Sequence, residues 1–214
     1  ILNKKVKEDL SEPINGVVRR RFDLVKKEIL YFCSRMGVSE NVLFLTAFNY
    51  TVGLFSDEKE LFTCSIHSGR TDGRWRRLAG CLFLTYFTRY NVVAHETTID
   101  LLKRSGRQIM DTMKAVISVP REGEMFFQYQ ADIIRIPTVG DAPAEQVHLQ
   151  LDSLPFHMQV MTDEQGYYVE LRYWRNRFED RLMEIFVDCY EAIVKAMAME
   201  EERSARRLKK HIPD

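Results

Sequence analysis

The sequence predicts an α/β fold, a two-layer sandwich in which helices cover a mixed β-sheet. Two observations lead to this class. Some segments carry apolar residues at every third or fourth position, which is the helical period, and shorter segments carry them at alternate positions or in unbroken runs between turn residues, which is typical of strands. The expected order is α, α, β, β, α, β, β, β, α. We divide the 214 residues into a charged lead-in at 1–13, one domain at 14–199 and a charged tail at 200–214.

The first two helices are expected between residues 22 and 55. An apolar stripe marks the first, and Gly37 ends it because glycine accepts the left-handed conformation of a helix C-terminus. Ser39 can cap the second helix. Its residues 42–48 are apolar almost all round, which predicts deep burial and an end near Phe55. The stripe of the first helix consists of Phe22, Val25, Ile29, Phe32, Cys33 and Met36.

Two strands and a long helix are expected next. Residues 61–66 form the first strand, and a turn-rich stretch at 67–73 follows it. Residues 81–93 are apolar or aromatic on both alternating sets, which predicts a strand covered on both faces. Thr97 or Thr98 caps the helix, which ends before Pro120. Its apolar stripe consists of Ile99, Leu102, Ile109, Met113, Val116 and Ile117.

The remaining elements are three strands and a last helix. The segment at 131–150 contains two prolines and is expected to be irregular. After it, two alternating segments around the turn at 163–166 predict an antiparallel hairpin with one drier face. His157 is expected to point away from that face. The last helix carries its apolar stripe between Phe178 and Met197. The strands are expected at 125–130, 156–160 and 167–173.

The composition excludes several classes of function. Lys plus Arg and Asp plus Glu are both 31, so no whole-chain field attracts nucleic acid or an anionic membrane. The longest mostly apolar stretch, 41–55, is shorter than the roughly 20 residues of a membrane span. The absence of a C-x-x-C pair predicts free thiols in a reducing cytosol, and hence a cytoplasmic protein. The cysteines are Cys33, Cys64, Cys81 and Cys189.

The first residue is Ile1, and the opening residues are too charged for a signal peptide, so we expect the chain to be a piece of a larger protein.

No motif for nucleotide, hydrolase or metal chemistry is present in the sequence. The five histidines are scattered. His67, at a strand end before a turn, is the strongest catalytic candidate among them, although structural roles are favoured for all five. The run Arg74 to Arg77 encloses Trp75 and has two readings: a patch that stacks bases and holds phosphates, or a solvated loop, which the zero net charge favours. Arg19 to Arg21 is expected to be an exposed face or tail. We expect no bound metal and no nucleic-acid partner.

A series of motifs resembles the second half of condensation domains of nonribosomal peptide synthetases. In that family a strand ends in a Ser-Gly-Arg-like loop and a Gly-x-Phe-x-Asn-Thr strand follows. The first pattern is matched by Thr63 to Arg70 and the second by Gly80, Thr85 and Arg89. The strand at 125–130 and the segment Leu171 to Phe178 also agree in order. The resemblance covers about residues 15–200, and Leu84 departs from it, because many relatives have Asn there.

The resemblance implies a second, C-terminal lobe with a fold like chloramphenicol acetyltransferase. The parent would be a V-shaped pair of lobes with a tunnel between them, reached by the phosphopantetheine arms of peptidyl and aminoacyl carrier proteins. The family's catalytic His-His-x-x-x-Asp-Gly motif belongs to the first lobe and does not occur in this sequence. The lobe is therefore expected to be inactive alone, with no cofactor bound directly and no catalytic residue of its own. Its partners would be the N-terminal lobe and carrier proteins.

The resemblance also assigns residues. Residues 131–150 are the candidate for a segment that latches onto the first lobe. Two other interpretations stay open: a complete acyltransferase of the chloramphenicol acetyltransferase type, and a binding domain without catalysis. The expected tunnel residues are Ser68, Gly69, Arg70, Leu84 and Thr85.

Overall fold

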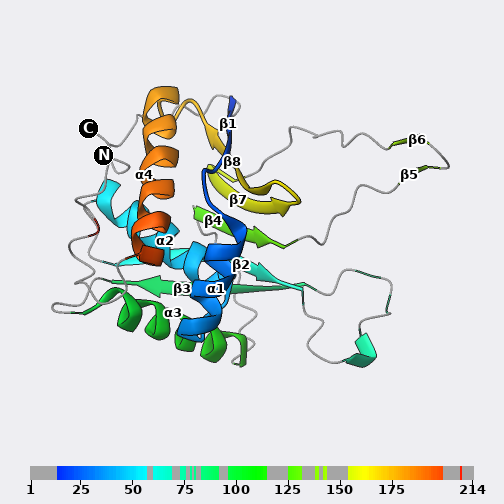
Figure 1. The fold of residues 1–214 in the computed structure, drawn as a ribbon. Helices are drawn as coiled ribbons and strands as arrows, with labels where there is room; N and C mark the ends of the chain where they lie inside the picture. The colour runs from blue at the N-terminus through cyan, green and yellow to red at the C-terminus, as the bar shows by residue number, and fades with distance from the viewer. Residues whose placement is uncertain are drawn as a thin grey trace.

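A six-stranded mixed sheet forms the centre of the computed structural model, in the order β1-β8-β7-β4-β2-β3 (Figure 1). The parallel pairs are β2 with β4 and β4 with β7, and the other neighbours are antiparallel. The strands are β1 Asn15–Arg21, β2 Leu61–His67, β3 Leu84–Tyr90, β4 Met125–Gln130, β7 Phe156–Asp163 and β8 Gly166–Trp174. The structure describes residues 14–56, 60–68, 73–75, 78, 80, 83–91, 96–114, 125–131, 138–139, 142–143, 154–199 and 208.

Four α-helices within the described residues accompany the sheet, in agreement with the predicted α/β sandwich. The sheet is contacted by α2, α3 and α4, and α1 packs on α2 (Figure 1). None of the described helices is both long and apolar enough to span a membrane. The helices are α1 Lys26–Met36, α2 Glu40–Phe55, α3 Thr98–Lys114 and α4 Asp180–Met199, and the short 3-10 helix η1 is Gly73–Trp75.

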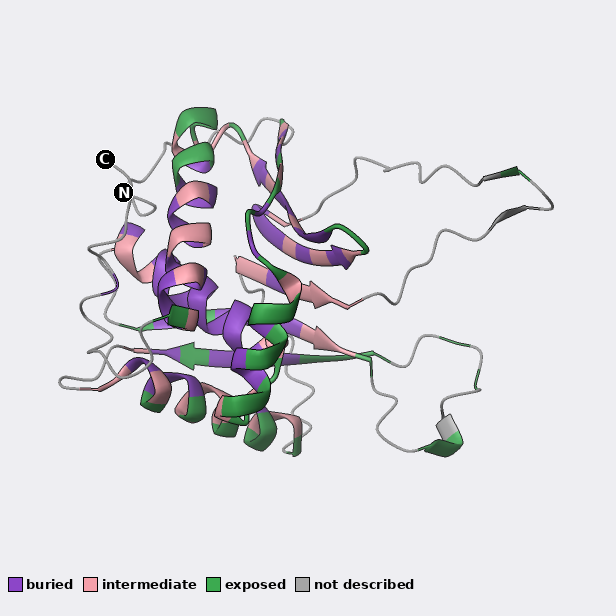
Figure 2. Ribbon diagram, in the orientation of Figure 1, coloured by how far each residue is buried: buried purple, intermediate pink, exposed green. Residues whose placement is uncertain are grey.

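The core lies between this helical layer and one face of the sheet (Figure 2). Helix α2 is buried over nearly its whole length, as its all-round apolar sequence predicts. At its centre the ring of Phe48 lies 5.1 Å from Phe127 on β4 and 6.1 Å from Phe186 on α4. These aromatic contacts join strand and helices into one apolar unit, and each adds about 1 kcal/mol beyond the burial of its area.

Helices α2 and α3 begin at side-chain caps, whereas α1 does not. Ser39 caps α2, because its Oγ accepts a hydrogen bond from the N–H of Val42 at 3.2 Å. Thr97 caps α3 in the same way, accepting from the N–H of Asp100 at 3.2 Å. The predicted start of the first helix was wrong: Phe22 is buried but precedes the helix, and Val25 occupies its N-cap position with an exposed side chain. Both fit the helical spacing by chance, since Phe22 enters the core from the end of β1.

Gly37 ends α1 in the left-handed conformation, with φ of 67°, as predicted.

The prediction that β3 is covered on both faces was wrong. Tyr86, Thr88 and Tyr90 are buried, whereas Thr85 and Arg89, on the other alternating set, are exposed. β3 is an edge strand whose helix contacts come from α3 and α2, so one set of side chains faces the helices and the other faces away.

Strand β1 was not predicted, because its sequence has little apolar alternation. Its residues pair with β8 along the whole strand, Val18 is buried, and its three arginines make ion pairs. Arg19 pairs with Glu170 on β8, Arg20 with Asp188 on α4, and Arg21 with Asp163 on β7. Arg19 and Arg21 are exposed, as expected from the sequence, but the three arginines belong to a strand with specific partners and not to a tail.

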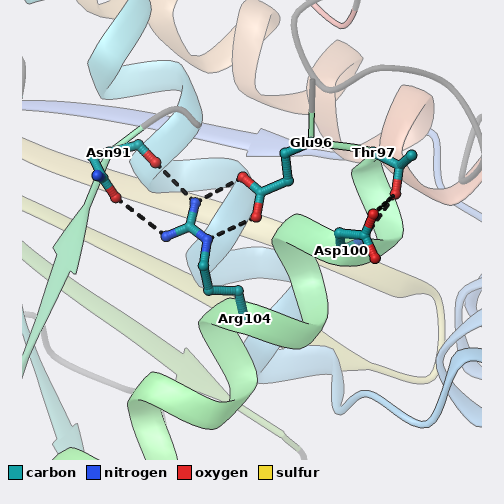
Figure 3. Close-up of polar contacts among 5 residues, drawn as sticks. All are labelled: Asn91, Glu96, Thr97, Asp100 and Arg104. Atoms are coloured by element: carbon teal, nitrogen blue, oxygen red, sulfur yellow. Dashed lines mark hydrogen bonds and ion pairs between the residues drawn. The ribbon is translucent and has the colours of Figure 1, made fainter. Parts of the chain in front are cut away.

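Arg104 fixes the connection between β3 and α3 (Figure 3). Its guanidinium donates to both carboxylate oxygens of Glu96, at 2.7 and 2.8 Å, and to the backbone oxygen of Asn91 at 2.9 Å. The hydrogen bonds from Arg104 to Glu96 raise the pKa of the guanidinium, so this half-buried pair stays charged.

Candidate functional site

One face of the sheet carries the side chains that point away from the described helices, and we call it the helix-free face. Its residues alternate with core residues along every strand: Gln128 with the fully buried Phe127, and Gln159 with the fully buried Met158. Most side chains on this face are half-buried and polar or amphipathic. The alternation of buried and half-buried residues along the strands can be followed in Figure 2. A sheet with one dry face and one accessible face is the arrangement that offers a long, flat wall to a ligand or a partner.

A single row of side chains crosses the helix-free face from one sheet edge to the other. The strand register places Arg19 beside Glu170, Glu170 beside Gln159 and Gln159 beside Gln128. Gln159 Nε2 donates to Gln128 Oε1 at 3.1 Å. The row continues on the two remaining strands. Because Ser65 lies beside Phe127, Ile66 is next to Gln128, and Ile66 is paired with Thr85 on β3. The row consists of Arg19, Glu170, Gln159, Gln128, Ile66 and Thr85.

Glu170 is the most deeply buried charged residue in this row, because its side chain is only 3% exposed whereas that of Arg19 is 57% exposed. Arg19 Nε donates to Glu170 Oε2 at 2.5 Å and Arg172 Nε donates to Oε1 at 2.6 Å. Burial by itself raises the pKa of Glu170, but the hydrogen bonds from Arg19 and Arg172 outweigh it and leave the pKa below its usual value of 4.5. The carboxylate is therefore ionised at neutral pH and fully engaged by the two arginines.

His157 lies on the helix-free face, as predicted, and packs against an aromatic ring. Its imidazole is edge-on to Phe126, with ring centroids 4.8 Å apart, and the residue is 8% exposed. His67, the other histidine considered from the sequence, is half-buried at the end of β2, paired with Leu84. The two histidines lie on different strands, β7 and β2, with β4 between them. His157 is therefore a packed histidine, and the two histidines are too far apart in the sheet to act together as a catalytic pair.

The expected tunnel residues lie at one end of the β2–β3 edge. Ser68 directly follows β2, and Leu84 and Thr85 begin β3, where they pair with His67 and Ile66. Thr85 points to the helix-free face. Leu84 has the opposite direction and is 46% exposed, because it lies beyond the end of the helical cover. The structure brings these three together; Gly69 and Arg70 lie outside the described residues.

The other segments singled out in the sequence are described only in part. Within 131–150, the short strands β5, Thr138–Val139, and β6, Ala142–Pro143, pair antiparallel as a second small sheet, and Figure 1 shows it apart from the main sheet. Arg74 is exposed in η1. Arg76 and Arg77 lie outside the described residues.

The cysteines that the structure describes are buried free thiols. Burial raises the pKa of Cys33 to about 12, with the nearby Glu40 contributing, and burial raises the pKa of Cys64 to about 11. Such thiols remain protonated at neutral pH and are poor metal ligands or nucleophiles. Within the described ranges no group of three His, Cys, Asp or Glu side chains is arranged to hold a metal ion.

Three exposed basic residues of helix α3 lie at helical spacing, and we call them the basic stripe: Lys103, Arg107 and Lys114. The same side of the helix carries the exposed Asp111, whose carboxylate lies 3.6 Å from the Lys114 ammonium group, and Met110, which is 56% exposed. The helix begins near the end of β3 and runs back toward the start of that strand (Figure 1). Its C-terminal turn therefore lies toward the sheet end that carries Leu84 and Thr85.

The sequence did not single out Gln128, Gln159, Glu170 or Arg172 as site residues. The alternation in 125–130 and 156–173 does indicate which residues share a face. Only strand order and register, which come from the fold, bring the three strands β4, β7 and β8 together and place these polar residues close to one another on the sheet.

The fold is an α/β sandwich of the kind found in the lobes of condensation domains. One similar solved structure is a four-domain nonribosomal peptide synthetase bound to AMP and glycine, with a TM-score of 0.75 and 16% sequence identity over 90% of this chain. A second is the condensation domain of the Monacolin K polyketide synthase, with a TM-score of 0.72 and 12% identity over 88% of this chain. A third is a cyclization-docking bidomain from Sorangium cellulosum, with a TM-score of 0.73 and 13% identity over 91% of this chain. At these identities the likeness shows the fold.

The match covers only part of each structure. The chain spans 17% of the four-domain synthetase, 48% of the Monacolin K condensation domain and 44% of the bidomain, so it has about half the length of a condensation domain. No family model and no curated protein matches the sequence.

Proposed function

We propose that the chain is the second, C-terminal lobe of a condensation domain of a nonribosomal peptide synthetase. The observation that supports one lobe is the coverage of the structural matches, because 88% of this chain aligns with 48% of a condensation domain. The choice of the second lobe rests on the motif resemblance and on the absence of the first lobe's motif from this sequence. In such a domain the lobe forms one wall of the acyl-transfer tunnel and contacts carrier proteins. Without the His-His-x-x-x-Asp-Gly motif of the first lobe it is inactive alone, and it works in the cytoplasm.

The helix-free face is the wall that this function requires. Amide formation between two tethered groups depends on holding an amine near a thioester carbonyl, and most of the rate gain comes from effective concentration. A flat face of half-buried polar side chains on six strands is rigid enough to position an extended arm. Ser68 and Thr85 stand at the sheet end where the arm enters. Leu84 lies at the same sheet end, and the proposal assigns Gly69 and Arg70, which lie outside the described residues, to the entrance as well.

The basic stripe on α3 supports the contact with carrier proteins. A phosphopantetheine arm is joined to its carrier through a phosphodiester, so the docked carrier brings a negative charge to the tunnel entrance. Lys103 and Arg107 attract that charge, whereas the charge of Lys114 is partly offset by Asp111, and the exposed Met110 adds apolar contact.

A charge-reversal experiment tests the carrier contact. The double variant Lys103→Glu, Arg107→Glu is expected to weaken binding of the holo carrier protein at least tenfold, as measured by calorimetry at low salt. The matched control is Lys27→Glu, Arg35→Glu, which changes the same residue types on the exposed side of α1. Equal weakening by both double variants would contradict docking at α3.

The size of the native polypeptide tests the proposed function itself. An antibody raised against this chain is used to probe a lysate of the host. A band far above 25.2 kDa is expected, because a lobe belongs to a multidomain synthetase. A native band near 25 kDa would overturn the proposal and leave a complete acyltransferase of the chloramphenicol acetyltransferase type or a binding domain without catalysis.

A further inference from the structure

A pair of glutamines occupies the middle of the row on the helix-free face. Gln128 comes from β4 and Gln159 from the neighbouring β7, and their side-chain amides share a hydrogen bond of 3.1 Å. The backbone holds both rigidly, because the residues next to them, Phe127 and Met158, are fully buried in the core. The two amides are therefore presented side by side at the centre of the sheet.

The shared hydrogen bond leaves part of each amide available. Gln128 Nε2 remains a donor and Gln159 Oε1 remains an acceptor, and neither makes another hydrogen bond to the part of the chain that the structure describes. Rotation of both amides by 180° exchanges the two roles but again leaves one donor and one acceptor. The pair thus offers complementary hydrogen-bonding groups whichever way it is oriented.

The neighbours of the pair determine which ligand it suits. On one side, both oxygens of Glu170 are engaged by Arg19 and Arg172, so the carboxylate does not draw on the glutamines. On the other side lies the apolar Ile66. A neutral ligand that both accepts and donates hydrogen bonds, with apolar links between its polar groups, fits this environment better than an ion does.

We propose that Gln128 and Gln159 form a binding site for the amide groups of a phosphopantetheine arm, an inference that rests on the proposed function. Gln128 Nε2 donates to an amide carbonyl and Gln159 Oε1 accepts from an amide N–H. Pantetheine has two secondary amides separated by two methylene groups, so an extended arm lying along the row presents both kinds of group. The two glutamines are positioning residues for the arm and take no part in bond making.

Titration of the full chain with pantetheine, followed by NMR, tests the site. Gln128→Met and Gln159→Met keep the length of the side chain but remove its hydrogen bonds, and each is expected to weaken binding about fivefold, the effect of one neutral hydrogen bond. Gln130→Met is the matched control, since Gln130 is the same residue type on the same strand and face, two positions away. It is expected to leave the affinity unchanged.

A second probe tests the acceptor of the pair. An analogue of pantetheine with esters in place of both amides keeps the carbonyls but lacks the N–H groups. The unaltered protein is expected to bind the ester about fivefold more weakly than pantetheine, whereas the double variant Gln128→Met, Gln159→Met binds the two probes equally, because it has neither amide oxygen.

The outcomes distinguish this inference from the function on which it rests. Absence of pantetheine binding, or binding that Gln128→Met and Gln159→Met leave unchanged, would overturn the glutamine site even if the native polypeptide is a large synthetase. A native band near 25 kDa would overturn the proposed function whatever the titration gives. Loss of binding in Gln130→Met to the same extent would show a general effect on the strand and would also overturn the site.

Discussion

Glu170 is the residue at which electrostatics and the fold are most tightly linked. Removing one partner from a buried ionic cluster leaves the others uncompensated, and here Arg172 and Arg19 both depend on the same carboxylate. Glu170→Gln is expected to lower the free energy of unfolding at pH 7 by about 2 kcal/mol, less than for a fully buried cluster, because Arg19 is largely exposed. Urea denaturation measures the change.

The pH dependence of this effect has a definite sign. The folded protein lowers the pKa of Glu170 below 4.5, so the ionised carboxylate stabilises the fold above that pH, and the contribution is lost as the pH falls through the folded-state pKa. The difference between Glu170→Gln and the unaltered protein should therefore shrink toward pH 3. The exposed Glu184, which pairs with Arg20, supplies the control: Glu184→Gln is expected to change stability by less than about 0.5 kcal/mol. A pH-independent difference at Glu170 would contradict the ionic explanation.

Gly16 is a residue whose missing side chain the structure requires. A Cβ atom at this position of β1 would lie 2.4 Å from Cζ of Tyr173, its cross-strand neighbour. The Tyr173 ring has little room to move, since it is buried and its hydroxyl donates to Asp180 at 2.7 Å. Gly16→Ala is expected to cost about 2 kcal/mol of stability in thermal or chemical denaturation. Gly53→Ala is the control, because its nearest contact would be an ordinary 3.5 Å.

At the scale of the element, helix α3 contains a glycine, Gly106, that no close contact requires and that lowers the stability of the helix. A Cβ at Gly106 would lie 3.6 Å from a methyl group of Val42, an ordinary van der Waals contact. Because glycine in a helix interior is about 1 kcal/mol less favourable than alanine, Gly106→Ala is expected to raise the free energy of unfolding by about 1 kcal/mol. Chemical denaturation measures this gain, and a loss of stability would show that the α2–α3 contact needs the glycine.

The elements also show what the sequence can predict. Strand β4 and the helix α2 were predicted closely, because alternation and an all-round apolar run are local properties of the chain. Strand β1 could not be predicted, because its partners Glu170, Asp163 and Asp188 are far away in the sequence. The exposed face of β3 was missed for a related reason: a local pattern does not reveal which strand is at the edge of the sheet.

At the scale of the whole molecule, the candidate site depends on long-range order. The glutamine pair joins residues 31 positions apart, and the contact between Arg19 and Glu170 joins residues 151 apart. The sequence indicates that each of these residues is polar and on a strand, but the sheet order decides that they form one row. Ser68, Leu84 and Thr85 lie at one sheet end, because β2 and β3 are consecutive in the chain and directly paired, and their assignment to a tunnel stays a prediction.

The sheet order also predicts how stability is distributed over the molecule. The central strands β7 and β8 have hydrogen-bonded neighbours on both sides and pack against buried helices, so their amides should exchange with solvent only by global unfolding. The edge strands β1 and β3 have one strand neighbour each within the described sheet, and β1 is held largely by exposed or half-exposed ion pairs, so their amides should exchange through local opening. Native-state hydrogen exchange measured by NMR at 0.1 and 1 M salt checks this, because screening should accelerate exchange in β1 and leave β8 nearly unchanged. Equal protection of β1 and β8 at both salt concentrations would mean that β1 opens only with the core, and that apolar packing of Val18, more than the arginine pairs, holds this edge of the sheet.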